Sequence, residues 1–332
     1  MEPTSHPTRR PTVPAAEEIL GGYFPVLDHG FVALVDYMGT DDSVERAARV
    51  SYGYGTRKVS ATRGLVRYLR RHLHTTPSEM VEFKFHCAMP MFVARQWIRH
   101  RTASVNEYSG RYSLMPLLFY RPERDQFSLQ SATSNQGRAP GSVSPDFYRE
   151  AIRRWEDVRA RAADDYGWLV GENVARELAR IDLPLSTYTQ WYWKIDLHNL
   201  LHFLTLRVDD HAQWEIQEYG RVMAGMVKRV APLSYEAWID YQVMGDKLSG
   251  GEIAALARLV SADDDGVAAR AGAKLTNAEL AGVGLSGREI REFKGKLAPR
   301  EVPDYELDLT KMRDPQDVAA EMDKAVPAVD RG

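Results

Sequence analysis

Thirteen consecutive residues, from Arg99 to Arg111, carry an unusual concentration of side chains that can bind an anion. The run reads RHRTASVNEYSGR and contains three arginines, a histidine, two serines, an asparagine and a glutamate. Each guanidinium offers paired donors and a permanent charge, which suits phosphate oxygens. Ser109, Gly110 and Arg111 add a hydroxyl, a residue that lets backbone N–H groups approach a ligand, and a cation. The run therefore predicts an anion site, and a solvated basic loop is the alternative interpretation.

The residues before this run predict a helix that positions part of it. Pro90 suits the start of a helix, and Gln96 and Arg99 then lie three positions apart on one face. Phe92 and Trp97 fall on the face that is expected to meet the core. The helix should therefore carry Gln96 and Arg99 into the loop that follows.

The segment 81–89 alternates between apolar and polar residues, as a strand with one buried face does. Its apolar positions include Cys87, the single cysteine of the sequence, which is therefore expected to be buried. One cysteine excludes an intrachain disulfide and favours a reducing compartment, so we expect a cytoplasmic protein. No apolar run approaches membrane-spanning length, and the first residues lack the apolar core of a signal peptide, so we expect no membrane partner.

Composition divides the chain into three parts. Residues 1–22 are rich in proline and predict a disordered tail, residues 23–242 form the globular part, and residues 243–332 predict short helices or partial disorder. The net charge is −3 and the pI is about 6.3, so nothing global attracts the protein to nucleic acid.

Other elements follow from hydrophobic periodicity, capping residues and prolines. In chain order we expect a strand at 31–35, helices at 43–51 and 62–72, a mobile loop at 121–144, a long helix after Pro145, a helix at 172–181, a strand at 185–195, a helix capped by Asp196, a helix from Asp210, and short amphipathic pieces at 252–260 and 286–297.

The pattern Arg-His-Arg, seven residues, then Ser resembles the signature of the flavin-dependent thymidylate synthases. It is formed by Arg99, His100, Arg101 and Ser109. The longer form of the signature adds Ser104, Asn106 and Arg111. Further blocks that match the family in the right order are 30–32, 46–51, 74–79, 92–97, 179–185, 206–207 and 211–215.

This resemblance implies a fold, a reaction and a set of partners. The family has an α+β fold, with a mixed, largely antiparallel sheet flanked by long helices, in a single catalytic domain that assembles as a homotetramer with active sites at subunit interfaces. Its reaction methylates dUMP at C5 to give dTMP. The one-carbon unit comes from 5,10-methylenetetrahydrofolate, and the reducing hydride comes from NADPH through bound FAD.

The resemblance also implies roles for individual residues. Arg207 and Ser109 are the candidates for catalysis. The residues that would bind dUMP are Gln96, Arg99, Glu107, Ser109, Gly110, Arg111, Arg180 and Arg207. The residues that would bind FAD are His74, Thr76, Glu79, Arg99, His100, Arg101, Asn106, Glu107, Asp196, His198 and His202.

The residue types agree with this chemistry. Carbon C5 of uracil becomes nucleophilic when negative charge enters the ring, and a cysteine thiolate is one way to achieve this. Cys87 is expected to be buried, so a hydride delivered to a polarised uracil is the alternative route, and a guanidinium such as Arg207 can stabilise the charge at N3 and O2. Ser109 has no activating residue near it in sequence, so we assign it to positioning phosphate and ribose.

Three positions depart from the family, which often has asparagine, arginine and asparagine where this chain has Asp196, His198 and His202. These substitutions change the local charge near the flavin, so the sequence does not determine how the protein sets the reduction potential of the flavin.

Three alternatives are weighed. The same flavin and folate chemistry on UMP is the nearest. His198 and His202 have the spacing of zinc ligands, with His211 as a third, which would suit a zinc-dependent hydrolase. That motif lacks its glutamate, so we expect no metal. Arginine and aromatic residues at 68–74 and 95–112 resemble a nucleic-acid-binding surface, which the acidic net charge disfavours.

Overall fold

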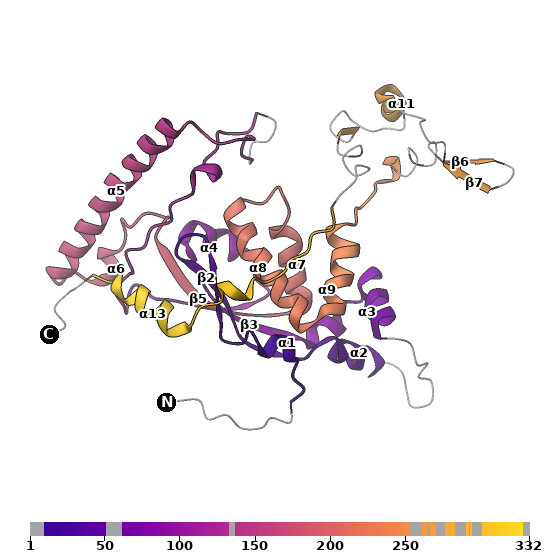
Figure 1. The fold of residues 1–332 in the computed structure, drawn as a ribbon, viewed down its shortest axis with the longest axis horizontal. Helices are drawn as coiled ribbons and strands as arrows, with labels where there is room; N and C mark the ends of the chain where they lie inside the picture. Colours follow the sequence, from indigo (N-terminus) through magenta and orange to yellow (C-terminus); the bar gives the residue numbers. More distant parts are fainter. Residues whose placement is uncertain are drawn as a thin grey trace. The chain divides into compact units, whose positions relative to one another are not determined.

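The computed structural model describes residues 10–50, 62–132, 137–252, 256, 260–263, 266–269, 276–282, 290–291, 293 and 301–327 (Figure 1). Contacts divide the chain into two compact units. The first unit comprises Met1–Ala237 with Tyr305–Gly332, and the second comprises Trp238–Asp304. The segment after Asp304 therefore packs with the first unit, whereas composition had grouped it with the residues that precede it.

A five-stranded antiparallel sheet organises the first unit. Its strands are β1 (Tyr23–Val26), β2 (Gly30–Met38), β3 (Glu82–Pro90), β4 (Ser104–Glu107) and β5 (Tyr188–Asp196), in the order β1-β2-β3-β5-β4. The strand expected at 81–89 is confirmed as β3, and Cys87 is fully buried. The architecture is α+β, as expected from the family resemblance.

Helices cover one face of the sheet: α4 (Met91–Trp97), α7 (Leu197–Arg207) and α8 (Trp214–Val230) (Figure 1). Trp97 lies at the centre of this packing. Its ring is 5.4 Å and 5.3 Å from those of Trp191 and Trp193 on β5, 5.1 Å from Phe203 on α7 and 5.7 Å from Tyr219 on α8. This aromatic cluster fixes the end of α4 and the middle of α7 relative to the sheet, and candidate site residues lie in the last turn of each helix.

Two capping residues explain where long helices begin. Ser144 accepts a hydrogen bond from the N–H of Phe147 at the start of α5 (Pro145–Gly171), with Pro145 in the first turn. Asp196 accepts one from the N–H of Asn199 at the start of α7, as the sequence predicted. The cap aligns α7 so that Arg207 lies in its last turn.

The other described elements complete the fold. They are α1 (Pro14–Glu17), α2 (Asp41–Val50), α3 (Thr62–Arg71), η1 (Thr76–Met80), η2 (Arg124–Gln126), α6 (Arg176–Ala179), α9 (Pro232–Trp238), η4 (Leu309–Lys311) and α13 (Pro315–Lys324), with η3 (Ile239–Val243), β6 (Val260–Asp263), β7 (Gly266–Ala269) and α11 (Asn277–Gly282) in the second unit.

Several predicted boundaries were wrong. The strand expected at 31–35 extends over the whole of β2. The helix expected at 172–181 is only the short α6, because Asn173 has a φ of +60° and interrupts the chain between α5 and α6. The α8 helix begins at Trp214 rather than at Asp210, because Asp209 accepts the N–H of His211 in a turn.

The chain ends also differ from the expectation. Residues 10–22, expected to lie in a disordered tail, include α1, and Ala16 and Ile19 are fully buried there. Within 121–144 the structure describes η2 and a bridge between Gln130 and Arg138, so part of this loop is regular. Most residues of the two pieces expected at 252–260 and 286–297 lie outside the described part of the chain. In the described parts, no helix is long and apolar enough to cross a membrane.

Candidate active site

The signature run meets α7 through a hydrogen bond between His100 and Arg207. The Nε of Arg207 donates to the Nε2 of His100 at 3.0 Å, although the residues are 107 positions apart. Nε2 must be unprotonated to accept this bond. Burial, followed by the charges of Arg207 and His202, lowers the pKa of His100 to about 4, so the imidazole is neutral at pH 7. Burial also lowers the pKa of Arg207.

Gln96 lies in the last turn of α4, and its side chain contacts Gln213, the residue directly before α8. Its Nε2 donates to the Oε1 of Gln213. Gln213 precedes the first residue of α8, and the N–H groups of Ile216 and Gln217 donate to its carbonyl. The α8 helix therefore supports the side chain of Gln96. Gln96, His100 and Arg207 form what we call the helix group, because α4 and α7 position them.

Ser109, Gly110 and Arg111 form a tight turn after β4. The Oγ of Ser109 accepts the N–H of Arg111 at 3.3 Å. Gly110 is buried, and a Cβ there would lie 2.6 Å from the Sδ of Met115 and 3.0 Å from the Cδ of Arg180. A larger residue at 110 would therefore force the side chains of Met115 and Arg180 to move, and Arg180 lies directly against the turn. We call Glu107, Ser109, Gly110, Arg111 and Arg180 the turn group.

Arg111 is held by an acidic residue of α6. Its Nε donates to the Oε2 of Glu177 at 2.9 Å, and one Nη lies 2.8 Å from the same atom. Both side chains are more than half exposed, so the pair is weak and exchangeable. The carboxylate of Glu177 occupies part of the donor fork that would bind a phosphate.

Glu107 lies at the end of β4, where its side chain is anchored to the sheet. The Oγ1 of Thr189 donates to its Oε1 at 2.8 Å. Asn106 pairs with Tyr192 across β4 and β5, and it is exposed, as are Arg99 and Arg101. Between the helix group and the turn group, no hydrogen bond or ion pair forms among the described residues.

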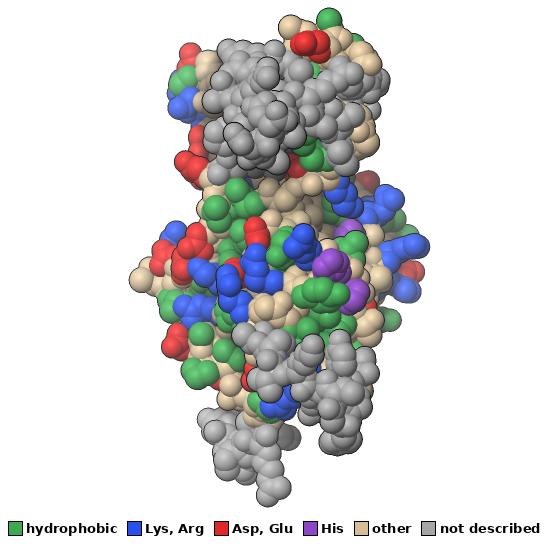
Figure 2. All heavy atoms as spheres, turned by 90° about the vertical axis from the view of Figure 1, so that its right-hand side faces the viewer, with side chains coloured by type: hydrophobic (Ala, Val, Ile, Leu, Met, Phe, Trp, Pro, Cys, Tyr) green, Lys and Arg blue, Asp and Glu red, His purple; other side chains and the backbone are tan. Residues whose placement is uncertain are grey.

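Some of the residues expected to contact the flavin lie on η1, on the loop before it and on α7, and η1 packs against α7. Thr76 and Glu79 lie in η1, and the ring of His74 lies 5.8 Å from that of Tyr68. On α7, the ring of His202 lies 6.2 Å from that of His100. Because His100 is hydrogen-bonded to Arg207, this region adjoins the helix group. Histidine side chains lie beside lysine and arginine side chains on one face of the molecule (Figure 2).

His198 of α7 carries a buried polar atom in this region. Its Nδ1 is buried and has no hydrogen-bond partner in the described part of the chain. Burial, and then the charge of Arg70, lower its pKa. Asp196 is already engaged, because its second oxygen accepts the side-chain amide of Asn199 at 2.6 Å. Both oxygens of Asp196 are thus engaged by Asn199.

The zinc alternative lacks a third ligand. His211 is 91% exposed and is paired with Asp209 at 2.8 Å. Among the described residues, His198, His202 and His211 do not form a group that could hold a metal ion.

Three contacts escaped the sequence analysis: Gln213 with Gln96, Glu177 with Arg111, and the ion pair of Arg138 with Glu215. Gln213 and Glu215 lie in the block 211–215, whose match to the family was the available signal. Nothing in the local sequence marks Glu177 or Arg138, since their partners are 66 and 77 positions away.

Comparisons with known proteins identify the family of this chain. Residues 33–233 match the family model described as thymidylate synthase complementing protein. The flavin-dependent thymidylate synthase of Gluconobacter oxydans is 51% identical over 259 residues, which cover 77% of this chain and 85% of the relative. That of Ruegeria pomeroyi is 47% identical over 295 residues, or 87% and 92% of the two chains.

Solved structures give the same result. The crystal structure of a UMP/dUMP methylase from Streptomyces cacaoi bound with 5-Br UMP has a TM-score of 0.60 and 33% identity, and the match covers 66% of this chain and 97% of the other. The same enzyme bound with 5-Br dUMP matches with a TM-score of 0.60 and 31% identity. The chain therefore belongs to the flavin-dependent thymidylate synthase family.

Proposed function

We propose that this chain converts dUMP to dTMP in a site to which two subunits contribute, one through the helix group and the other through the turn group. The main support for this function is the hydrogen bond between His100 and Arg207, because it joins the signature run to the arginine expected at the uracil ring. The one-carbon donor is 5,10-methylenetetrahydrofolate, and NADPH is the reductant. FAD, when bound, supplies the hydride that it receives from NADPH.

The residues of the η1 and α7 region fit FAD. The buried, unpartnered Nδ1 of His198 is a polar atom that a ligand can satisfy. His74, Thr76 and Glu79 would hold the flavin from η1 and the loop before it, and His198 and His202 from α7. Arg99, Arg101, Asn106 and Glu107 would reach it from the signature run.

Arg207 polarises the substrate. Its guanidinium stays protonated, because arginine does not lose its proton in proteins even when burial lowers its pKa. A fixed cation at O2 and N3 of uracil stabilises the negative charge that develops as C5 becomes nucleophilic. The neutral His100 accepts from Nε and leaves the terminal Nη donors of Arg207 for the ring.

The turn group binds the phosphate and ribose. Arg111 and Arg180 supply charge, and the turn at Gly110 lets backbone N–H groups approach the phosphate. Ser109 positions the nucleotide rather than attacking it, because its hydroxyl accepts the Arg111 N–H and no base contacts it among the described residues.

A homotetramer would assemble one site from these two groups, which share no hydrogen bond or ion pair within the described part of one chain. Large apolar side chains are exposed around the turn group in the single chain: Tyr112 (77%), Leu178 (57%), Ile181 (67%) and Leu185 (62%). Such a patch favours burial against another subunit. The cytoplasm and the absence of nucleic-acid partners remain expectations from the sequence.

UMP is the second candidate substrate. The related Streptomyces cacaoi enzyme is described as a UMP/dUMP methylase and was solved with both 5-bromo nucleotides. Binding and turnover of dUMP and UMP, which differ only at the 2′ position, separate the two substrates.

The visible absorption spectrum tests the proposal. The purified protein should be yellow, NADPH should reduce it under anaerobic conditions, and dUMP should change the rate of reduction. A protein that stays colourless after FAD is supplied, and that contains zinc, would contradict the proposal and favour the zinc hydrolase.

A further inference from the structure

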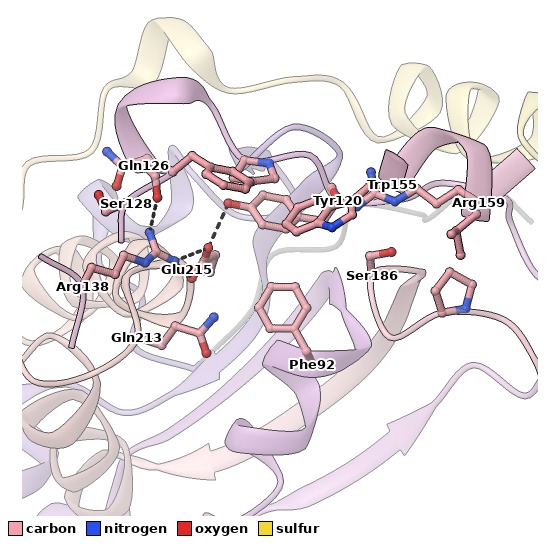
Figure 3. A pocket seen from close by; sticks show the side chains of 14 residues that line it. Phe92, Tyr120, Gln126, Ser128, Arg138, Trp155, Arg159, Ser186, Gln213 and Glu215 are labelled. Carbon is pink, nitrogen blue, oxygen red and sulfur yellow. Dashed lines mark hydrogen bonds and ion pairs between the residues drawn. The ribbon is translucent and has the colours of Figure 1, made fainter. Parts of the chain in front are cut away.

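A cavity of about 520 Å³ lies between α4, α5, the segment after Phe119 and the turn before α8 (Figure 3). Aromatic rings from separate segments line it. Phe92 of α4 packs 5.6 Å from Tyr120, and Trp155 of α5 packs 5.3 Å from Phe127. Such walls suit a planar ring, which gains both apolar burial and stacking.

One end of the cavity is electrically neutral. An Nη of Arg138 lies 2.5 Å and 2.6 Å from the two carboxylate oxygens of Glu215, and the hydroxyl of Tyr120 donates to the same carboxylate at 3.1 Å. The Glu215 side chain is only 3% exposed. Because Arg138 uses both carboxylate oxygens, this end offers a ligand no net charge.

The other end carries the guanidinium of Arg159. In Figure 3, Arg159 lies at the opposite end of the cavity from Arg138. Its Nη2 donates to the carbonyl of Tyr120 at 2.7 Å, and its guanidinium lies 5.3 Å from the centre of the Trp155 ring. With the rest of the described chain, Arg159 forms no ion pair.

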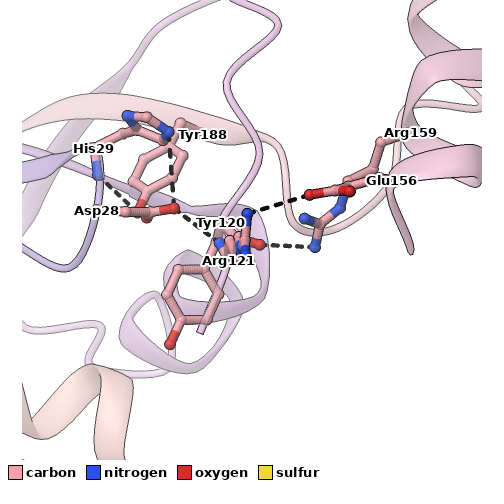
Figure 4. A network of polar contacts seen from close by, with 7 residues as sticks. All are labelled: Asp28, His29, Tyr120, Arg121, Glu156, Arg159 and Tyr188. Atoms are coloured by element: carbon pink, nitrogen blue, oxygen red, sulfur yellow. Dashed lines mark hydrogen bonds and ion pairs between the residues drawn. The ribbon is translucent and has the colours of Figure 1, made fainter. Parts of the chain in front are cut away.

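The nearest acidic residues are already engaged (Figure 4). Glu156 pairs with Arg121 at 3.3 Å. Asp28 accepts from the hydroxyl of Tyr188 at 2.6 Å and from the N–H of Arg121 at 2.8 Å. The charges of Asp28 and Glu156 act on Arg159, but within the described chain neither carboxylate forms a hydrogen bond or ion pair with its guanidinium, which can therefore receive an anionic ligand group.

The cavity adjoins the nucleotide site. Phe92, in its wall, and Gln96, in the helix group, lie one helical turn apart on α4, a separation of about 5–6 Å between Cβ atoms. Gln213 lines the cavity and also accepts the hydrogen bond from Gln96. Of the ligands that the proposed reaction needs, NADPH is one for which the signature blocks supply no residues.

We infer that this cavity binds the adenosine 2′-phosphate end of NADPH, with the adenine between the aromatic walls and the phosphate at Arg159. The inference rests on the proposed function. Gln126, Ser128 and Ser186 supply polar groups at the lining for the edge of the ring. The p-aminobenzoyl-glutamate end of the folate, also an aromatic ring with an anionic tail, is the competing source of this chemistry.

Binding of 2′,5′-ADP to the FAD-loaded, oxidised enzyme tests the inference by calorimetry. Trp155→Leu and Arg159→Gln should each weaken binding about tenfold or more, through lost stacking and a lost charge-assisted contact. Phe147→Leu and Arg161→Gln are matched controls on exposed positions of α5 outside the cavity, and they should leave binding unchanged. The affinity for dUMP should be unchanged in all four variants.

Steady-state kinetics provides the second readout. In the two cavity variants, the KM for NADPH should rise while kcat at saturating NADPH stays close to that of the wild type. If Trp155→Leu does not fold, 2′,5′-ADP binding and the KM for NADPH in Arg159→Gln alone test the inference. An active wild type whose cavity variants bind 2′,5′-ADP normally would overturn the inference, as would variants that lose only p-aminobenzoyl-glutamate binding. Failure of the proposed function is distinct, because the wild type itself would then form no dTMP.

Discussion

The Nε of Arg207 donates a hydrogen bond to the Nε2 of His100 at 3.0 Å. The bond requires a neutral imidazole, and the environment supplies one, because burial and two neighbouring basic residues lower the pKa of His100 to about 4. The signature histidine thus orients the arginine that we assign to the uracil ring.

Replacing His100 tests this orienting role. His100→Gln places an amide oxygen near the position of Nε2 and should retain much of the activity, whereas His100→Leu removes the acceptor. Loss of a hydrogen bond to a charged group costs about 1.5–3 kcal/mol, so the leucine variant should lose about tenfold to a hundredfold in kcat/KM for dUMP. Equal losses in both variants, with FAD still bound, would contradict the orienting role.

The lowered pKa of His100 predicts how stability depends on pH. In the unfolded chain, an imidazole takes up its proton near about pH 6.5, whereas His100 in the folded chain does so only near pH 4. The unfolded state binds more protons between these values, so His100 makes stability fall as the pH falls through this window. Thermal unfolding at about pH 7.5 and about pH 5 should show that acidification lowers the stability of His100→Gln less than that of the wild type. An equal loss in the two proteins would mean that His100 does not contribute to this dependence.

Arg207→Ala should abolish dTMP formation while the flavin remains bound. The charge that develops on uracil would then have no guanidinium to stabilise it, and the residues assigned to FAD on η1 would be unchanged. The flavin absorption spectrum and a dTMP assay on the same sample measure both effects. Normal turnover would show that another group polarises the ring.

Glu177→Gln should strengthen dUMP binding, because it removes the carboxylate that occupies the Arg111 fork. Exposed ion pairs contribute about 0–1 kcal/mol, so the gain should be at most about fivefold. Arg111→Ala is the comparison, with an expected loss of about 2–4 kcal/mol in dUMP binding. Titration with dUMP at low and high salt measures both, and weaker binding in Glu177→Gln would show that Glu177 supports the site.

Local sequence patterns predicted the parts of the fold that depend on local interactions. Alternation identified β3, and Pro145 and Asp196 marked the starts of α5 and α7. Resemblance supplied the signature residues. The failed boundaries, at α6 and α8, reflect single residues, Asn173 and Asp209, whose backbone or side-chain geometry outweighs helical periodicity.

The candidate site could be predicted only in part, for a physical reason. Periodicity places Gln96 and Arg207 near the ends of helices, but their partners depend on how distant segments pack. Gln96 is 117 positions from Gln213, and Arg111 is 66 positions from Glu177. The same holds for the cavity beside Trp155, whose walls come from four segments that only the tertiary fold brings together.

Co-expression of Arg207→Ala and Arg111→Ala chains carrying different tags tests the shared site most directly. Each variant alone should form almost no dTMP. If Arg207 and Arg111 reach one site from different subunits, random mixing restores both residues in about a quarter of the sites, and activity should recover in proportion. Purified mixed oligomers that remain inactive, although they bind FAD and equal the wild type in size, would contradict a site shared between subunits.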